Sequence, residues 1–277
     1  MLTMTIDGLW VLQVLTGIEV VAPELGLRPH FPSVEAPEMA LTHPAAAELR
    51  STGAIGANGE VDHTVAEWLT VLARRDLALL LHAQIRSHAA ELDQVLLARF
   101  ARWWVALERF GDLVRLSAAG TATTEQSAGL VIGGQIDRLC GKLSPAEFRP
   151  VTLDADQLIS AVERREGLEP ALRQQRLSDD QVRALVVAGD PERSAQISIV
   201  AIQSGVGSAV GRTHIGSGAV TVIDSPAGRL IVEHTKRDGR SWMIAAPGSN
   251  SNIAAAVQKM LRRLPAQDNW HSYRKAV

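Results

Sequence analysis

The chain opens with a nearly unbroken run of apolar residues. Residues 5–29 read TIDGLWVLQVLTGIEVVAPELGLRP, with no charge between Asp7 and Glu19. A helix that is apolar on almost every side packs against several neighbours at once, so we predict a buried helix capped by Asp7. A membrane span needs about 20 apolar residues. A secretory signal needs basic residues near its start, whereas the first basic residue here is Arg28. We expect neither.

Apolar residues recur at helical spacing in four further segments. In 62–75, DHTVAEWLTVLARR, a capping box of Thr64 and Glu67 precedes the apolar stripe. In 177–189, LSDDQVRALVVAG, Ser178 and Gln181 form the same pattern. A third helix is predicted in 248–266, ahead of Pro265. The fourth, within 123–139, is weaker because it contains three glycines.

The remaining apolar segments are typical of strands joined by short turns. In the first part of the chain these are 76–85, a long extended segment at 95–108, and 112–117. In the second part they are 195–202, 218–225, 228–235 and 240–246. Short joints predict antiparallel neighbours. Trp103 and Trp104 are adjacent in a strand and must point to opposite faces. One of them is therefore either buried under helices or available as an anchor for a partner.

The order of predicted elements occurs twice along the chain. TIDGLWVLQVL at 5–15 has a fainter counterpart in TLDADQLISAV at 152–162. Each is followed by helices, several strands and a final helix. We predict two similar halves, 1–143 and 150–277, joined by KLSPAEFRP and sharing one sheet with a helical group at each end. The sequence therefore indicates an α+β fold with internal duplication.

Composition and net charge mainly exclude classes of function and of binding site. Hydrophobic residues make up 46% and charged residues 21%, with a net charge of −2, so we expect neither nucleic-acid nor anionic-membrane binding. The only cysteine, Cys140, excludes an intramolecular disulfide, and the scattered histidines give no metal-ligand spacing. A buried role for Cys140 is favoured over a catalytic thiol. The glycine-rich GVGSAVG at 205–211 is followed by a strand-like segment rather than a helix. It therefore favours a strand connection, with a nucleotide-binding enzyme as an alternative.

Several of these segments also resemble the EspG proteins associated with ESX (type VII) secretion. The similarity runs in order along essentially the whole chain, and is greatest to the member that belongs to the second ESX system. No single motif carries it. It is carried by 5–29, by EWLTVLARRDLALLL at 67–81, by FARWWVALERFGDLVRL at 100–116, and by PGSNSNIAAAVQKMLRRLPAQDNWHSYR at 247–274.

The resemblance implies a cytosolic chaperone that binds the helical tip of the PPE protein in a PE–PPE heterodimer. It implies no enzymatic activity, no cofactor and no membrane insertion. It also implies a quasi-two-fold fold, in which a central, mostly antiparallel sheet carries amino- and carboxy-terminal helical bundles. A homo-oligomeric scaffold remains an alternative, and the chain is expected to be a monomer or a dimer.

Carried onto this chain, the family's partner surface falls in the second half, within 168–190, 205–218 and 219–235. The residues expected to contact the partner there are Arg176, Gln181, Gln203, His214, Thr221 and Glu233. A variable loop of the family corresponds to RSHAAELDQ at 86–94, with His88, Glu91 and Asp93. This loop is short here, so we expect it to contribute less to partner contact than in relatives with a longer loop.

Overall fold

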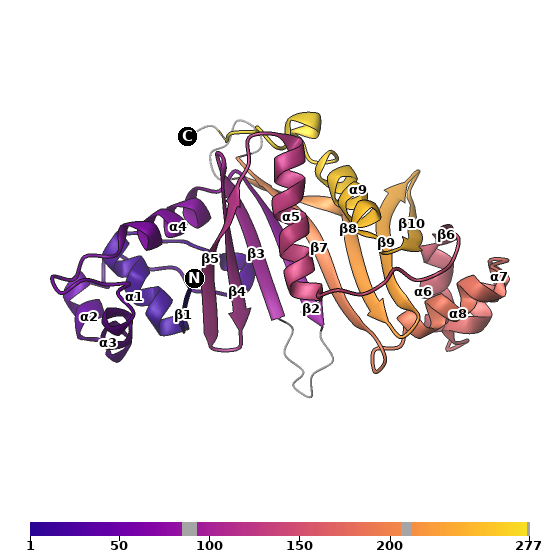
Figure 1. Ribbon diagram of the computed structural model, residues 1–277, viewed down its shortest axis with the longest axis horizontal. Helices are drawn as coiled ribbons and strands as arrows, with labels where there is room; N and C mark the ends of the chain where they lie inside the picture. Colours follow the sequence, from indigo (N-terminus) through magenta and orange to yellow (C-terminus); the bar gives the residue numbers. More distant parts are fainter. Residues whose placement is uncertain (85–92, 206–211, 276–277) are drawn as a thin grey trace.

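The computed structural model describes residues 1–84, 93–205 and 212–275 (Figure 1). The elements before residue 141 begin with a short strand and a group of helices, continue with four strands and end with a long helix. They are β1 (Leu2–Thr5), α1 (Ile6–Thr16), η1 (Pro23–Leu25), α2 (Pro37–Thr42), α3 (Pro44–Ser51), α4 (His63–Arg74), β2 (Leu77–Gln84), β3 (Asp93–Phe100), β4 (Trp103–Phe110), β5 (Leu113–Thr121) and α5 (Glu125–Cys140).

The same order then repeats in the rest of the chain. These elements are β6 (Val151–Asp154), α6 (Ala155–Glu163), α7 (Leu168–Gln174), α8 (Asp179–Ala188), β7 (Ala195–Ser204), β8 (Thr213–Ser225), β9 (Gly228–Arg237), β10 (Arg240–Pro247), α9 (Asn250–Leu261) and η2 (Gln267–Asn269). The predicted element order is thereby confirmed.

The ten strands of the described residues pair antiparallel in one sheet, in the order β1-β5-β4-β3-β2-β7-β8-β9-β10-β6. The order reads equivalently from both edges toward the central β2–β7 pair, where Leu80 lies opposite Val200. The predicted α+β class and its quasi-two-fold duplication are confirmed. The limits 1–143 and 150–277 for the two units stay a prediction.

Helices cover the two faces of the sheet differently. α5 and α9 lie across one face, and the groups α1–α4 and α6–α8 stand at the two ends (Figure 1). Leu79 of β2 belongs to the apolar cluster under α5 and α9, whereas the next residue, Leu80, packs against the cluster built on α1–α4. In β9, Ile231 joins the α5/α9 cluster and Val232 joins the cluster built on α6–α8. Both terminal groups therefore pack on the face opposite α5 and α9. We call the two faces the bundle face and the α5/α9 face.

The apolar opening segment forms the buried helix α1, as predicted. Leu9, Val11 and Leu12 are at most 1% exposed. The predicted cap is wrong, however, because Thr5 rather than Asp7 accepts the hydrogen bond from the Gly8 N–H. The strand β1 places Thr5 directly at the start of the helix, two residues earlier than the predicted cap.

Two further predictions need correction. α4 is capped by Asp62, whose carboxylate accepts from the Val65 N–H, and not by a box of Thr64 and Glu67. The segment 95–108 is not one extended strand, because it turns back after Phe100 to form the β3–β4 hairpin. Ala101 adopts φ +54° in that turn. Residues other than glycine and asparagine rarely take this conformation, so the local sequence does not mark the turn. By contrast, the capping box of Ser178 and Gln181 on α8 is confirmed.

The last described residues form a strap, residues 270–275, that ties the end of the chain to the first half. Trp270 is fully buried and donates from Nε1 to Glu125. The Tyr273 hydroxyl donates to the carbonyls of Ser204 and Gly205. The Lys275 N–H donates to Asp76 at 3.0 Å, and that carboxylate is buried at the start of β2. The strap therefore crosses the central β2–β7 junction.

Candidate partner-binding surfaces

The centre of the bundle face lies between the two terminal helical groups and is only partly covered. Leu80, Val200 and Ala219 stand in one row across β2, β7 and β8, and all three are half-buried. The next row is polar. With that row, the residues that we call the central strip are Leu80, Val200, Ala219, His82, Ser198 and Thr221.

Polar side chains continue the strip on both sides. Gln196 donates to Gln84 at 3.0 Å, and both are exposed. Across β8, the Thr221 hydroxyl lies 3.5 Å from His234 Nε2. Burial lowers the pKa of His234, so this ring is neutral at pH 7. An apolar row with a polar border is the anatomy of a protein–protein interface.

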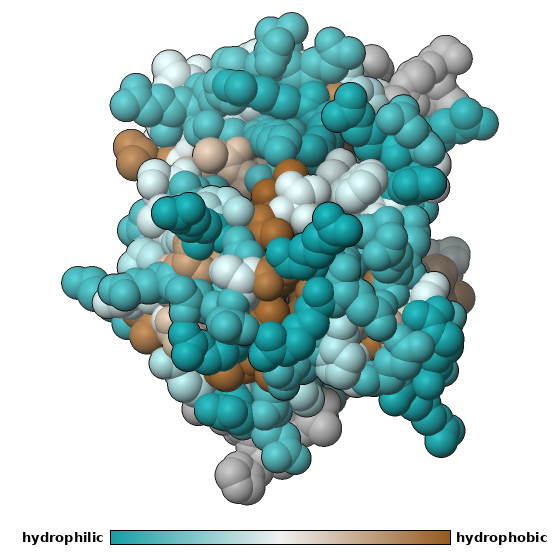
Figure 2. All heavy atoms as spheres, turned by 90° about the vertical axis from the view of Figure 1, so that its right-hand side faces the viewer, coloured by the Kyte–Doolittle hydropathy of each residue, from teal (hydrophilic) through white to brown (hydrophobic). Residues whose placement is uncertain are grey.

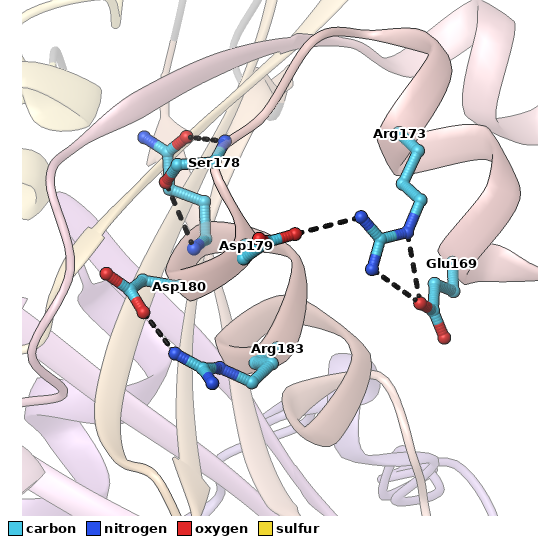
Figure 3. Close-up of polar contacts among 7 residues, drawn as sticks. Glu169, Arg173, Ser178, Asp179, Asp180 and Arg183 are labelled. Carbon is cyan, nitrogen blue, oxygen red and sulfur yellow. Dashed lines mark hydrogen bonds and ion pairs between the residues drawn. The ribbon is translucent and has the colours of Figure 1, made fainter.

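The helical group α6–α8 presents a charged surface beside the strip. Arg173 of α7 joins Glu169 at 3.0 Å and Asp179 of α8 at 2.9 Å (Figure 3). On α8, Arg183 pairs with Asp180. All five side chains are exposed, so each pair adds little to stability. This end of the molecule is hydrophilic, with a narrow apolar strip between polar side chains (Figure 2).

Two predicted contact residues lie in this charged region. Arg176 is exposed in the turn between α7 and α8, with φ +60°. Gln181 is held by two backbone interactions, because its Oε1 accepts from the Ser178 N–H and its Nε2 donates to the Arg149 carbonyl at 2.9 Å. Within the described ranges the Arg176 side chain makes no hydrogen bond or ion pair, whereas Gln181 already stabilises α8 and the segment before β6.

The structure divides the other predicted residues between the two faces. Thr221 belongs to the central strip. Gln203 and His214 lie opposite each other on the α5/α9 face, where Gln203 is 2% exposed and accepts from the Ala266 N–H. Glu233 is on the same face and pairs with Lys259 of α9 at 2.8 Å. The six predicted contact residues of the second half therefore do not lie together on one surface.

The short loop of the first half is largely beyond what the structure describes. His88 and Glu91 lie outside the described residues. The backbone of Asp93 begins β3, opposite Ala83. Their roles as partner contacts stay predictions.

Comparison with known proteins decides the family. The EspG family model matches residues 5–259. The chain belongs to the EspG family. It is 49% identical to the ESX-2 secretion-associated protein EspG2 of Mycobacterium tuberculosis strain H37Rv, over all of both chains. It is 29% identical to the ESX-3 secretion-associated protein EspG3 of Mycolicibacterium smegmatis, covering 95% of this chain and 87% of that protein.

A solved structure shares the fold. It is the Mycobacterium tuberculosis type VII secretion system chaperone EspG5, in complex with a PE25–PPE41 dimer. The TM-score is 0.74 at 23% identity, over 96% of this chain and 97% of that chain. The EspG-family architecture inferred from the resemblance is thereby confirmed. The expected similarity to the member of the second ESX system is confirmed by the identity to EspG2.

A second candidate surface of this EspG-family chain lies around Trp103, one of the two adjacent tryptophans noted in the sequence. Trp103 is 46% exposed and Trp104 is 1% exposed, so the predicted opposition is confirmed. On the bundle face, Trp103 lines an apolar pocket of about 700 Å³ with Trp68 and Val71 of α4. Phe100 completes its wall at the end of β3. The sequence pattern predicted that the two tryptophans point to opposite faces, but not which one is exposed, nor the helix that makes a pocket with it.

The glycine-rich segment does not precede a helix. Gly205 follows β7, and β8 begins at Thr213 with its first residue opposite Ser204. The segment therefore connects adjacent antiparallel strands, as the sequence favoured, although 206–211 lie outside the described residues. Within the described ranges, no three His, Cys, Asp or Glu side chains are grouped to hold a metal ion. No helix in those ranges is long and apolar enough to cross a bilayer.

Proposed function

We propose that this protein is a cytosolic type VII secretion chaperone that binds the helical tip of the PPE protein in a PE–PPE heterodimer. The observation that carries the proposal is membership of the EspG family together with 49% identity to EspG2 along the whole chain. The EspG5 structure with the PE25–PPE41 dimer supports the class of partner. The proposed role is to keep the apolar tip from aggregating and to direct the pair to its secretion system.

The proposed contact surface is the central strip together with the turn that carries Arg176. A helical tip places apolar anchors in a complementary surface and is oriented by polar contacts around it. The row of Leu80, Val200 and Ala219 offers the apolar part. The exposed Arg176 and the half-buried His82 and Ser198 offer polar contacts on its border, and Thr221, 8% exposed, lies in the same polar row as His82 and Ser198. Such binding needs no reactive group, so we propose that the protein is not an enzyme.

The proposal also includes four further partner contacts, which fewer observations support. They are Gln181, Gln203, His214 and Glu233. Gln203 and Glu233 point to the α5/α9 face and are already paired. Partner contact there would require rearrangement of α9 or of the segment that follows it, which contains Ala266. Arg176 requires none, because it is exposed. Thr221 belongs to the central strip but is only 8% exposed, with its hydroxyl 3.5 Å from His234 Nε2.

Co-expression with a PE–PPE pair encoded beside this protein tests the proposal. We expect a soluble ternary complex, and we expect Ser198→Arg to abolish capture because it places a long charged side chain on the central strip. Ser51→Arg, the same change at an exposed position of α3, is the matched control. Failure of the wild-type chain to retain the pair contradicts the function. Capture by Ser198→Arg equal to wild type contradicts only the placement of the site.

A further inference from the structure

A basic groove lies on the α5/α9 face, beyond the part of the sheet that α9 covers. α9 packs on β8 and β9, and the strands β9, β10 and β6 continue past it toward the edge of the sheet (Figure 1). The groove has a volume of about 820 Å³. Its floor contains Trp242 and Ile244 of β10, and both are half-buried.

Cations dominate the walls of the basic groove. The cationic side chains that line it are Lys236, Arg237, Arg240, Lys259 and Arg263. Only one acidic side chain, Asp238, lines it with them, and that carboxylate lies 3.6 Å from Arg237. This local excess of positive charge contrasts with the net charge of −2 for the whole chain.

Acidic neighbours neutralise only part of this charge. Glu233 pairs with Lys259 at 2.8 Å. Asp156 of α6 accepts from the Ser241 N–H, and this hydrogen bond, helped by the nearby cations Lys236 and Arg240, holds the pKa of its carboxyl below the usual value. Nevertheless, three of the lining cations form no ion pair within 4 Å in the part of the chain that the structure describes. They are Lys236, Arg240 and Arg263.

We propose that the basic groove binds an acidic segment of a partner protein. Carboxylates of that segment pair with Lys236 and Arg240 on the strand side and with Arg263 on the helix side. An apolar side chain of the same segment covers Trp242 and Ile244. The groove lies on the face opposite the central strip, so this is a second binding site that does not depend on the proposed contact with the helical tip.

The chemistry favours a peptide over a nucleic acid. Nucleic-acid binding requires basic charge spread along a phosphate track and is assisted by a positive overall charge. Here the unpaired cations flank a single cavity, and part of its floor is the aliphatic Ile244. Paired carboxylate contacts around an apolar anchor match that arrangement.

Selection from a displayed library of random 12-residue peptides tests the inference. The full chain is the bait, and the Lys236→Glu/Arg240→Glu variant is used for counter-selection. We expect the retained peptides to be acidic and to contain at least one aromatic or aliphatic residue. Fluorescence anisotropy on a synthesised winner should show weaker binding by roughly tenfold or more for that variant. Binding should also weaken as salt is raised.

Two further variants locate the site. Arg263→Glu reverses the charge on the opposite wall and should weaken binding of the same peptide. Arg74→Glu/Lys142→Glu changes the net charge by the same amount as the double groove variant at exposed positions elsewhere, and should bind like wild type. Melting temperatures confirm that all variants are folded. Retained peptides without acidic residues, equal binding by the groove variants, or tighter binding of a 12-nucleotide single-stranded DNA would each overturn the inference.

Discussion

The guanidinium of Arg99 donates a hydrogen bond to the backbone carbonyl of Tyr273, with 2.5 Å between Nη2 and the oxygen. Arg99 lies in β3, is fully buried, and also donates to the carbonyl of His271. Burial lowers its pKa to about 10, a shift opposed by the nearby Asp76 carboxylate. The side chain therefore remains charged at neutral pH and is solvated by the strap instead of by water.

Replacing Arg99 should loosen the strap. We expect Arg99→Met to lower the free energy of unfolding by about 2–3 kcal/mol, because it leaves buried carbonyls without donors. Urea denaturation measures the change. Arg102→Met, at an exposed position three residues later, should change stability by less than about 0.5 kcal/mol. Equal effects of the two substitutions would show that the strap does not depend on Arg99.

Trp103 and Trp104 form a matched pair for testing the two sheet faces. Trp104→Ala removes a side chain that is 1% exposed and should cost about 3–5 kcal/mol. Trp103→Ala removes one that is 46% exposed and should cost much less. Thermal denaturation of both variants decides the point. A Trp103→Ala variant as unstable as Trp104→Ala would mean that a further element covers the pocket in solution.

The structure and the sequence pattern assign different N-cap residues to α4. Asp62→Ala should cost about 1 kcal/mol, since it removes the acceptor for the Val65 N–H. Thr64→Ala alters the residue that the sequence pattern named as the cap, and should be neutral or slightly stabilising because alanine favours the helix interior. Chemical denaturation of the two variants gives the comparison. The opposite ranking would restore Thr64 as the cap.

Glu35 should make stability depend on pH in the acid range. Burial raises the pKa of its carboxyl, but hydrogen bonds from the Phe31 N–H, His30 and Arg28 outweigh this and lower it from 4.5 to about 2. The charged form is therefore favoured by folding, so its contribution is complete above pH 4.5 and is lost as pH falls toward 2. Glu35→Gln should be less stable than wild type at pH 7, with the difference shrinking between pH 4.5 and 2.

A control for this pH dependence is available nearby. Glu48 is exposed on α3, so Glu48→Gln should track wild type at every pH. Urea denaturation at pH 7, 4.5 and 3 measures all three proteins. A stability difference between wild type and Glu35→Gln that stays constant over this range would contradict the proposed charge contribution.

Local chemistry made the most regular elements predictable. The alternation of polar and apolar residues and the Ser178 box are signals carried within one or two helical turns, and the structure retains them. The duplicated element order was likewise visible because each half repeats the same sequence of periodicities. The β3–β4 turn was missed because Ala101 adopts φ +54° without a glycine to signal it.

The binding surfaces were less predictable because they depend on pairing between distant segments. Which face Gln203 or Glu233 points to follows from the strand register, and a shift of one residue reverses it. The burial of Arg99 depends on carbonyls of residues 271 and 273. The basic groove combines β9, β10 and the end of α9, so its charge becomes visible only when these elements are brought together.

The strap also constrains when the molecule can finish folding. Asp76 and Arg99 are synthesised early. Asp76 accepts from the Ala101 N–H of its own half, but further groups that compensate the two buried charges lie at 271–275. Until residue 275 has left the ribosome, the nascent first half carries two buried charges without those partners. Completion of the β2–β7 junction is therefore a late event, and the central strip beside it matures with it.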